Sequence, residues 1–396
     1  MSAIVQLASS AMIAFLSLII SSVVSHDLNF SDRSDYGIYM VTIGQFFVLT
    51  QMGMPGALNV SGLYAIKSGK IRQILIEFLK RAGVFTLATV ALFEIFELDS
   101  DTTIMILVGY LVSIPMQWII GGFQTHMNNW EHAIWRLGPT FVQFIILLTF
   151  LRSRDTLELF SFVEIWLIAN VVLFFMSAYR YSRLELGANE NLESSNIKTV
   201  SKLGQSGFIA HIGLSDLIKF ENYLIPLLKP VFYSANFFAV GGLANWPRIL
   251  IDGLATAYLP EYKKMNLEDA KILAARRVSR IVLVCTILLL ISKPFGEYLM
   301  NLLLGVRYRS GYDLFIILSL STLFAGSRRL YLDAFRSHGG RSSIFASKLE
   351  FRSWLISLSS IFILLGPFSI YSWAAVSAFT NFVSLLYLIK GWRSPK

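Results

Sequence analysis

The sequence predicts an all-α polytopic membrane protein with about twelve transmembrane helices, arranged as two six-helix bundles around a central cavity. Of its 396 residues, 55% are hydrophobic and only 15% are charged, whereas a soluble domain carries about a quarter charged residues. The mean hydropathy is +0.60. The apolar residues also form long, nearly uncharged runs, and a run of about 20 residues is what a helix needs to cross a bilayer. These runs leave no room for a sizeable soluble domain.

The apolar runs follow one another from the N-terminus. The first run has no basic residue ahead of it and no clear cleavage site, so it is expected to remain as the first transmembrane helix. Prolines inside later runs predict bends, because neighbouring helices or a cavity must satisfy the freed backbone carbonyls. These prolines are Pro55, Pro115, Pro139, Pro226, Pro247 and Pro294. The predicted helices span residues 4–26, 36–60, 82–97, 103–125, 133–151, 157–179, 206–228, 232–260, 279–304, 311–335, 342–366 and 369–390.

The basic residues alternate from loop to loop. Lys and Arg number 34 against 25 Asp and Glu, a formal net charge of +9. Alternate loops differ in charge, and the positive-inside rule places the loops rich in Lys and Arg in the cytoplasm. They cover residues 67–81, 180–202, 263–280 and 390–396. The pattern predicts a multi-pass protein of the bacterial cytoplasmic (inner) membrane with both termini in the cytoplasm, and it explains the charge without a nucleic-acid partner.

The longest polar stretch divides the chain in the middle. We expect an N-terminal six-helix bundle over residues 1–179, a cytoplasmic linker over 180–205 and a C-terminal six-helix bundle over 206–396. A weak repeat supports the division, because Tyr36-Gly37-Ile38-Tyr39 and Ser234-Ala235-Asn236-Phe237 open their helices about half the chain apart. Repeated halves are common among transporters, whose substrate path lies where the repeats meet.

The predicted helix 206–228 carries a polar stripe. At about 100° per residue, His211, Ser215, Lys219 and Asn222 share one face, and Asp216 lies beside them. A charge in the middle of a bilayer costs about 2.5 kcal/mol or more, so the stripe should face protein or a water-filled cavity. Two interpretations stay open: an Asp216–Lys219 pair that locks helix packing, or a site on a substrate pathway.

The predicted helix 232–260 holds a second polar group beside Pro247. Asn245, Arg248 and Asp252 lie about one turn apart on one face. Arg248 and Asp252 either form a purely structural pair, or Arg248 faces a cavity, where its permanently charged fork suits a phosphate. Other cations lie in the cytoplasmic halves of their helices and are expected to snorkel to the interface. They are Arg136, Arg328, Arg329, Lys348 and Arg352.

No pattern indicates an enzyme, a cofactor or a metal. Cys285 is the single cysteine and lies in an apolar run, where packing is its expected role. The histidines show no metal-ligand spacing. The segment Gly62–Lys70 lacks the glycine spacing of a P-loop, and no large outer loop offers paired carboxylates for acid–base catalysis. We therefore predict no catalytic residue, no cofactor-binding residue and no metal ligand.

Short blocks along nearly the whole chain resemble a known family. Asp35-Tyr36-Gly37-Ile38-Tyr39, followed by Gln51-Met52-Gly53-Met54-Pro55-Gly56-Ala57, resembles the second helix of bacterial O-antigen and capsule oligosaccharide flippases. These polysaccharide biosynthesis transporters are part of the MATE-like multidrug/oligosaccharidyl-lipid/polysaccharide exporter superfamily. Further blocks keep the order of that family. They are Glu221-Asn222-Tyr223, Ala235-Asn236-Phe237, Tyr258-Leu259-Pro260, Leu304-Gly305-Val306-Arg307-Tyr308, Gly366-Pro367-Phe368 and Ala374-Ala375.

The resemblance implies a MATE-like fold, with a cavity lined largely by helices 1, 2, 7 and 8. It also implies a flippase that moves a polyprenyl-diphosphate-linked oligosaccharide, the repeat unit of O-antigen, capsule or exopolysaccharide, across the inner membrane by alternating access. The expected partners are this lipid-linked glycan, membrane lipids, and a polysaccharide polymerase with its chain-length machinery. An ion-coupled small-molecule or drug exporter of the same fold, and a membrane-embedded glycan polymerase or acyltransferase, are the alternatives.

The polar residues of the two helices are the candidate site of such a flippase. The substrate pathway is expected to use Lys219, Arg248, His211, Ser215, Asn222 and Asn245. Three carboxylates are expected to pair with the cations or to carry a coupling proton. They are Asp216, Asp252 and Glu221.

Overall fold

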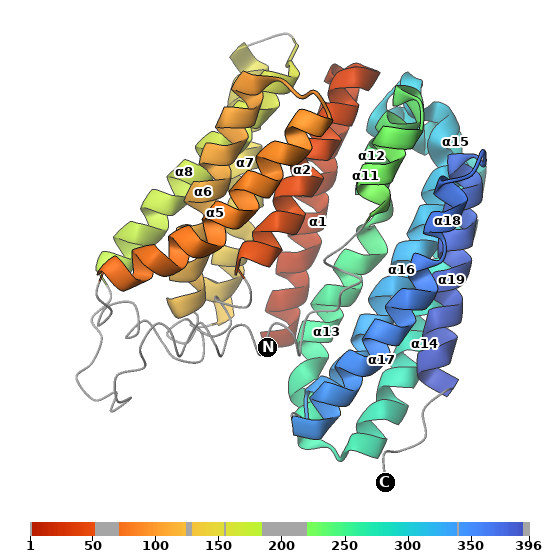
Figure 1. Ribbon diagram of the computed structural model, residues 1–396. Helices are drawn as coiled ribbons and strands as arrows, with labels where there is room; N and C mark the ends of the chain where they lie inside the picture. The colour runs from red at the N-terminus through yellow and green to blue at the C-terminus, as the bar shows by residue number, and fades with distance from the viewer. Residues whose placement is uncertain are drawn as a thin grey trace. The chain divides into compact units, whose positions relative to one another are not determined.

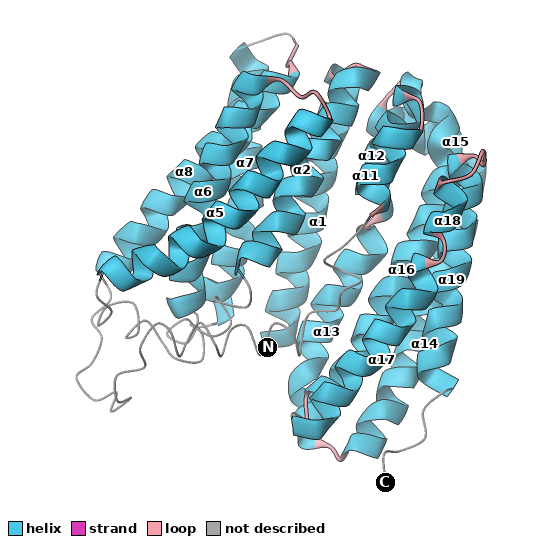
Figure 2. Cartoon of the chain, in the orientation of Figure 1, coloured by secondary structure: helices cyan, strands magenta, loops and turns pink. Residues whose placement is uncertain are grey.

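The computed structural model describes residues 2–51, 71–123, 129–153, 156–183, 220–338 and 340–390. Within these ranges the chain is helical, with short 3-10 turns and no strand (Figure 2). Five described segments are long and apolar enough to cross a membrane. They are Ser100–Ile120, Leu159–Ser182, Leu267–Leu304, Val306–Arg336 and Ile370–Lys390. The predicted all-α polytopic membrane fold is confirmed.

The first half of the chain forms the helices α1 (Ser2–Asp27), α2 (Phe30–Gln51), α5 (Ile71–Ile95), α6 (Ser100–Phe123), α7 (Asn129–Ser153) and α8 (Leu159–Ser182). The second half begins with α11 (Glu221–Leu228), α12 (Val231–Ala244), α13 (Trp246–Lys264) and α14 (Leu267–Ser292). It continues through the 3-10 turn Lys293–Phe295, α15 (Gly296–Leu304) and the 3-10 turn Val306–Gly311. The last helices are α16 (Tyr312–Arg336), α17 (Gly340–Leu358), α18 (Ile361–Leu364) and α19 (Ile370–Lys390).

The chain forms two compact units, Met1–Gly37 with His211–Lys396 and Ile38–Ala210. Within the first unit, α1 packs against α12, α13 and α15. The buried face of α1 includes Leu16, Ile20 and Val24, which lie one turn apart along the helix. The division predicted from the sequence, with bundles at 1–179 and 206–396 and a linker at 180–205, stays a prediction. The structure shows separately that α1 packs against helices of the second half of the chain.

A buried arginine fixes the corner between α1 and α2 within the first unit. Arg33 is 4% exposed, and its guanidinium donates to the Phe238 carbonyl at 3.0 Å and to Ser25 Oγ at 3.3 Å. Ser34 Oγ donates to Ser234 Oγ at 3.0 Å. A side chain at Gly37 would overlap the Phe238 ring, so glycine allows α2 and α12 to approach this closely. The start of α2 therefore packs against α12 within this unit.

The helix α16 is the centre of the first unit. It packs against α12, α13, α14, α17 and α19, and most of its side chains are buried (Figure 1). Its polar residues lie inside the unit because the neighbouring helices cover it on several sides. In the second unit α8 packs against α6 and α7, and the buried face of α6 repeats every turn with Ile106, Tyr110, Ile114 and Trp118.

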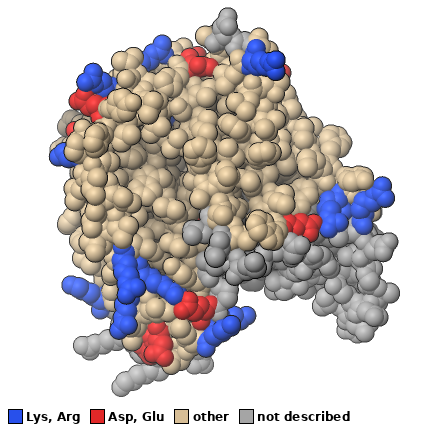
Figure 3. Space-filling view, turned by 180° about the vertical axis from the view of Figure 1, so that it is seen from behind, with Lys and Arg blue, Asp and Glu red and all other residues tan. Residues whose placement is uncertain are grey.

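The surface agrees with a membrane setting. On the face drawn in Figure 3, the described Lys, Arg, Asp and Glu side chains gather toward two margins, with a broad band free of them in between. Large apolar side chains are exposed on α14, among them Leu283 at 61% and Leu290 at 63%. Exposed apolar surface on this scale is expected where lipid replaces water around a helix.

Candidate functional site

The candidate site begins at a break between α12 and α13. The sequence predicts a bend at Pro247, and the break falls two residues earlier, at Asn245. Pro247 occupies the first turn of α13, where its missing N–H costs no helical hydrogen bond. The Ala244 carbonyl, which the break frees, accepts a hydrogen bond of 2.6 Å from Thr322 Oγ1 on α16. The break is thus held by the neighbouring helix.

The first turns of α13 carry a shared carboxylate. Arg248 Nε lies 4.0 Å from Asp252 Oδ2, and Arg329 NH1 of α16 lies 3.1 Å from Asp252 Oδ1. The side chains are 18% exposed for Arg248, 28% for Asp252 and 44% for Arg329. Two guanidinium groups that are partly open to the surroundings therefore meet at one carboxylate.

A glycine allows α13 and α16 to approach this closely. A Cβ at Gly326 would lie 3.1 Å from Ile251 Cδ1 and 3.5 Å from the Arg248 backbone. Gly326 therefore brings the backbone of α16 onto the turn that carries Arg248, and Arg329 follows one turn later.

The charged residues continue inward along α16 to α17. Arg336 NH1 lies 3.2 Å from Asp333 Oδ1, and Arg336 also forms an ion pair with Glu350 of α17. Here the side chains are 5% exposed for Arg336 and 8% for Glu350. We name the set Arg248, Asp252, Arg329, Asp333, Arg336 and Glu350 the charge ladder. Its α13 end is partly open, and its α17 end is buried.

Arg328 lies beside the ladder and is also buried. It is 5% exposed, and its NH1 donates to Ser357 Oγ at 2.6 Å and to the Ser353 carbonyl at 3.3 Å. Ser357 in turn donates to Asn381 Oδ1 on α19 at 2.9 Å. The expectation that Arg328 snorkels to the interface is wrong, because polar side chains of α17 and α19 satisfy the guanidinium inside the unit.

The other predicted site residues have separate positions. Asn222 is buried and Glu221 is half-buried on α11, which packs against α12 and α18 instead of α16. Asn245 Oδ1 is buried at the helix break, and no hydrogen-bond donor reaches it from the described residues. His211, Ser215, Asp216 and Lys219 lie outside the described residues. The assignment of all these residues to a substrate pathway or to coupling stays a prediction.

Sequence reasoning missed four members of the ladder. Arg329, Asp333 and Arg336 are spaced four and three residues apart, which places them on one face of a helix. That spacing was available as a signal, but it does not show that the face meets Asp252 or Glu350. The pairing depends on the packing of three helices that are distant in sequence.

The chemistry of the ladder suits an anion at its open end. Guanidinium groups bind phosphate or carboxylate oxygens with paired, charge-assisted hydrogen bonds. The Asn245 amide oxygen adds an acceptor for a hydroxyl or N–H group. Within the described ranges of the chain, no group of three or more His, Cys, Asp or Glu side chains could hold a metal ion.

Comparisons with solved structures show the fold. The chain is similar to the lipid II flippase MurJ in an inward closed conformation, with a TM-score of 0.66, 13% identity, and coverage of 98% of this chain and 87% of that one. It is also similar to a multidrug resistance MATE family transporter of the MOP superfamily in an inward-facing conformation, with a TM-score of 0.64, 14% identity and coverage of 98% and 96%. The Vibrio cholerae MATE transporter VcmN gives a TM-score of 0.60 at 13% identity, with coverage of 98% and 93%.

No protein-family model matches the sequence, and no curated protein matches it. At such low identities the structural similarity establishes the fold. The chain therefore has a MATE-like fold, as expected from the sequence motifs.

Proposed function

We propose that this protein is a flippase that moves a polyprenyl-diphosphate-linked oligosaccharide across the bacterial inner membrane by alternating access. The observation that carries the proposal is the open end of the charge ladder, where Arg248 and Arg329 share the single carboxylate of Asp252. A diphosphate carries the complementary charge and several acceptor oxygens. The fold is shared with a lipid II flippase and with multidrug transporters, and so accommodates both kinds of substrate.

The roles of the residues follow from their chemistry. Arg248 and Arg329 bind the diphosphate with charge-assisted hydrogen bonds. Asp252 holds the two guanidinium groups while the site is empty and yields them to the ligand. Asn245 Oδ1 accepts a hydrogen bond from a hydroxyl group of the first sugar. Lys219 and the other residues of the predicted stripe on 206–228 extend the cationic path, and substrate is loaded from the cytoplasm, where the basic loops lie.

An ion-coupled exporter of small cations or drugs is the competing function on this fold. A cation site needs an excess of carboxylates at its open end, and the open end of the ladder has two guanidinium groups beside the Asp252 carboxylate instead. A glycan polymerase or acyltransferase would need acid–base residues, and the ladder offers paired ions instead.

The test compares Arg248→Ala and Arg329→Ala with the control Arg276→Ala, an exposed arginine on α14. Each is expressed in the source bacterium from which the chromosomal copy is deleted, and surface polysaccharide and membrane abundance are both measured. A charge-assisted hydrogen bond contributes about 1.5–3 kcal/mol, so each site variant should lose roughly tenfold or more in export at normal abundance. Arg248→Lys should keep partial activity, because the charge remains without the fork.

Three results would count against the proposal. Full export by both alanine variants would remove the arginines from substrate binding. Loss of export in Arg276→Ala to the same degree would show a general effect of charge. Normal surface polysaccharide together with a changed sensitivity to cationic drugs in the deletion strain would favour the drug exporter.

A further inference from the structure

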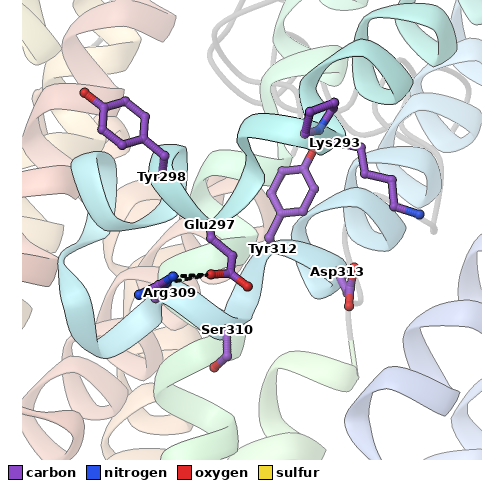
Figure 4. A pocket seen from close by; sticks show the side chains of 8 residues that line it. Lys293, Glu297, Tyr298, Arg309, Ser310, Tyr312 and Asp313 are labelled. Carbon is purple, nitrogen blue, oxygen red and sulfur yellow. Dashed lines mark hydrogen bonds and ion pairs between the residues drawn. The ribbon is translucent and has the colours of Figure 1, made fainter.

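A pocket lies at the C-terminal end of α14. It has a volume of about 490 Å³ and is formed by the 3-10 turn after α14, by α15, and by the start of α16. Its lining residues are Lys293, Pro294, Glu297, Tyr298, Arg309, Ser310, Tyr312 and Asp313 (Figure 4). It lies in the first unit, and none of its residues is part of the charge ladder.

The pocket holds two pairs of opposite charges in different states. Glu297 Oε2 lies 2.6 Å from Arg309 NH2 and accepts a second bond from Arg309 Nε at 2.7 Å. Lys293 and Asp313 line the same pocket, and no ion pair or hydrogen bond joins either side chain to another described residue. Figure 4 draws Lys293 and Asp313 on the other side of Tyr312 from the Glu297–Arg309 pair. Glu297 and Arg309 are thus paired with each other, whereas the Lys293 ammonium and the Asp313 carboxylate are available to a ligand.

The pocket follows an exposed apolar run of α14. The apolar run Ile281–Ile291 leads directly to it, and that run exposes Leu283, Val284, Leu288, Leu290 and Ile291 at 51–63%. The segment from α14 to α15 is one of those apolar enough to span a bilayer. Charged side chains next to such an apolar run can snorkel to the lipid headgroups, so we place the pocket at that level.

Exposed aromatic and apolar side chains lie on the turns and helix that form the pocket. Phe295 is 61% exposed, Tyr298 is 67% exposed, and Val306 is 72% exposed. Aromatic rings are typical of the membrane interface, where one part of the ring is apolar and another is wet. A ligand of this pocket therefore meets a charged interior and an apolar rim that continues into the lipid-facing surface of α14.

We propose that this pocket binds the headgroup of phosphatidylethanolamine. The phosphate contacts the Lys293 ammonium, and the primary ammonium of the lipid donates to the Asp313 carboxylate and to Ser310 Oγ. The acyl chains lie along the exposed apolar face of α14. An anionic phospholipid satisfies Lys293 but leaves Asp313 without a cation, and a phosphatidylcholine headgroup has no N–H to donate.

The inference is independent of the proposed transport function. Its test is native mass spectrometry of the purified full-length chain, with phosphatidylethanolamine, phosphatidylglycerol and phosphatidylcholine of identical acyl chains added in turn. The wild-type chain should retain phosphatidylethanolamine most strongly. Lys293→Ala and Asp313→Asn should each weaken its retention by about threefold, the scale of one partly exposed ion pair.

Charge reversal makes the test sharper. Asp313→Lys places two cations in the pocket, so this variant should prefer phosphatidylglycerol over phosphatidylethanolamine. Two control variants remove a matching exposed charge elsewhere, Lys264→Ala at the end of α13 and Asp101→Asn at the start of α6, and both should bind as the wild type does. Soluble glycerophosphoethanolamine, the headgroup without its chains, should bind far more weakly than the lipid.

Several outcomes would overturn the inference. Equal retention of the three lipids by the wild-type chain would show that the pocket does not select a headgroup. An unchanged preference in Asp313→Lys would place the lipid elsewhere. Equally tight binding of glycerophosphoethanolamine would show a site for a soluble ligand without a role for the apolar surface.

Discussion

At the buried end of the charge ladder, removal of the cation should lower the stability of the fold more than removal of one anion. Arg336 is placed between two carboxylates, Asp333 at 3.2 Å and Glu350, and both Arg336 and Glu350 are under 10% exposed. Arg336→Met removes the cation and leaves two carboxylates facing each other in a buried position. Glu350→Gln removes one anion, and Arg336 keeps Asp333 and gains an amide oxygen as acceptor.

The magnitudes follow from the cost of an uncompensated buried charge. Removal of one partner of a buried pair destabilises a fold by about 3–5 kcal/mol, whereas apolar replacement of both partners is often neutral or stabilising. We therefore expect Arg336→Met to lose about 3–5 kcal/mol and Glu350→Gln to lose about 1–2 kcal/mol, the cost of a weakened hydrogen bond. The double variant Arg336→Met with Glu350→Leu should recover most of the loss, because Asp333 still has Arg329 nearby.

The assay is unfolding of the purified chain in mixed micelles by a denaturing detergent. The wild type, Arg336→Met, Glu350→Leu and their double variant form the double-mutant cycle, and Glu350→Gln is measured beside them. The coupling between the two sites should be at least about 2 kcal/mol, in the direction that makes the double variant more stable than the sum of the single variants. The reasoning is refuted if Glu350→Gln costs as much as Arg336→Met, or if the two losses simply add.

Three further predictions concern packing, capping and topology. Gly37→Ala should lower the free energy of unfolding by about 1–3 kcal/mol through overpacking, while Gly44→Ala on the same helix, where a Cβ meets open space, should not; equal melting temperatures for the two variants would contradict this. Asp99 accepts hydrogen bonds from Thr102 N and Oγ1, each 2.8 Å, which holds the pKa of its carboxyl below 3.8; Asp99→Ala should therefore cost about 1 kcal/mol at pH 7 in a melting experiment, and the difference should vanish as the pH falls through that lowered pKa. Because Asp99 is exposed, a loss much larger than this would point to another cause. A reporter fused after Lys396 should signal from the cytoplasm, and an outward signal would reverse the proposed direction of loading.

The helices were predictable because hydropathy and length determine them in a membrane. The break between α12 and α13 was predictable to within two residues, because a proline disrupts the middle of a helix but is tolerated in the first turn, where Pro247 lies. The burial of Arg33 was not, because the sequence places it in a short polar connection. Its partners, the Phe238 carbonyl and Ser25 Oγ, are a backbone atom far along the chain and a small hydroxyl, and neither leaves a pattern.

The candidate site was predictable only where both partners lie on one helix. Arg248 and Asp252 are four residues apart, and helical periodicity alone brings them together. Arg329 was placed among the snorkelling cations because nothing in its local sequence identifies Asp252 as a neighbour. The contact arises from the close packing at Gly326, which a periodicity argument cannot reveal.

The two ends of the charge ladder differ in whether their arginines can exchange one anionic partner for another. At the buried end, Arg336 is shielded from water, so it could not exchange Glu350 and Asp333 for hydration. These ion pairs therefore have a structural role. At the open end, Arg248 Nε lies 4.0 Å from Asp252 Oδ2, beyond hydrogen-bond length, and the Arg329 side chain is 44% exposed, so both guanidinium groups are partly open to another anion. An anionic ligand there competes with Asp252, while the Arg336–Glu350 pair keeps α16 and α17 together. This separation of a fixed end from an exchangeable end is the physical reason to look for the ligand at Arg248 and Arg329 and for stability at Arg336 and Glu350.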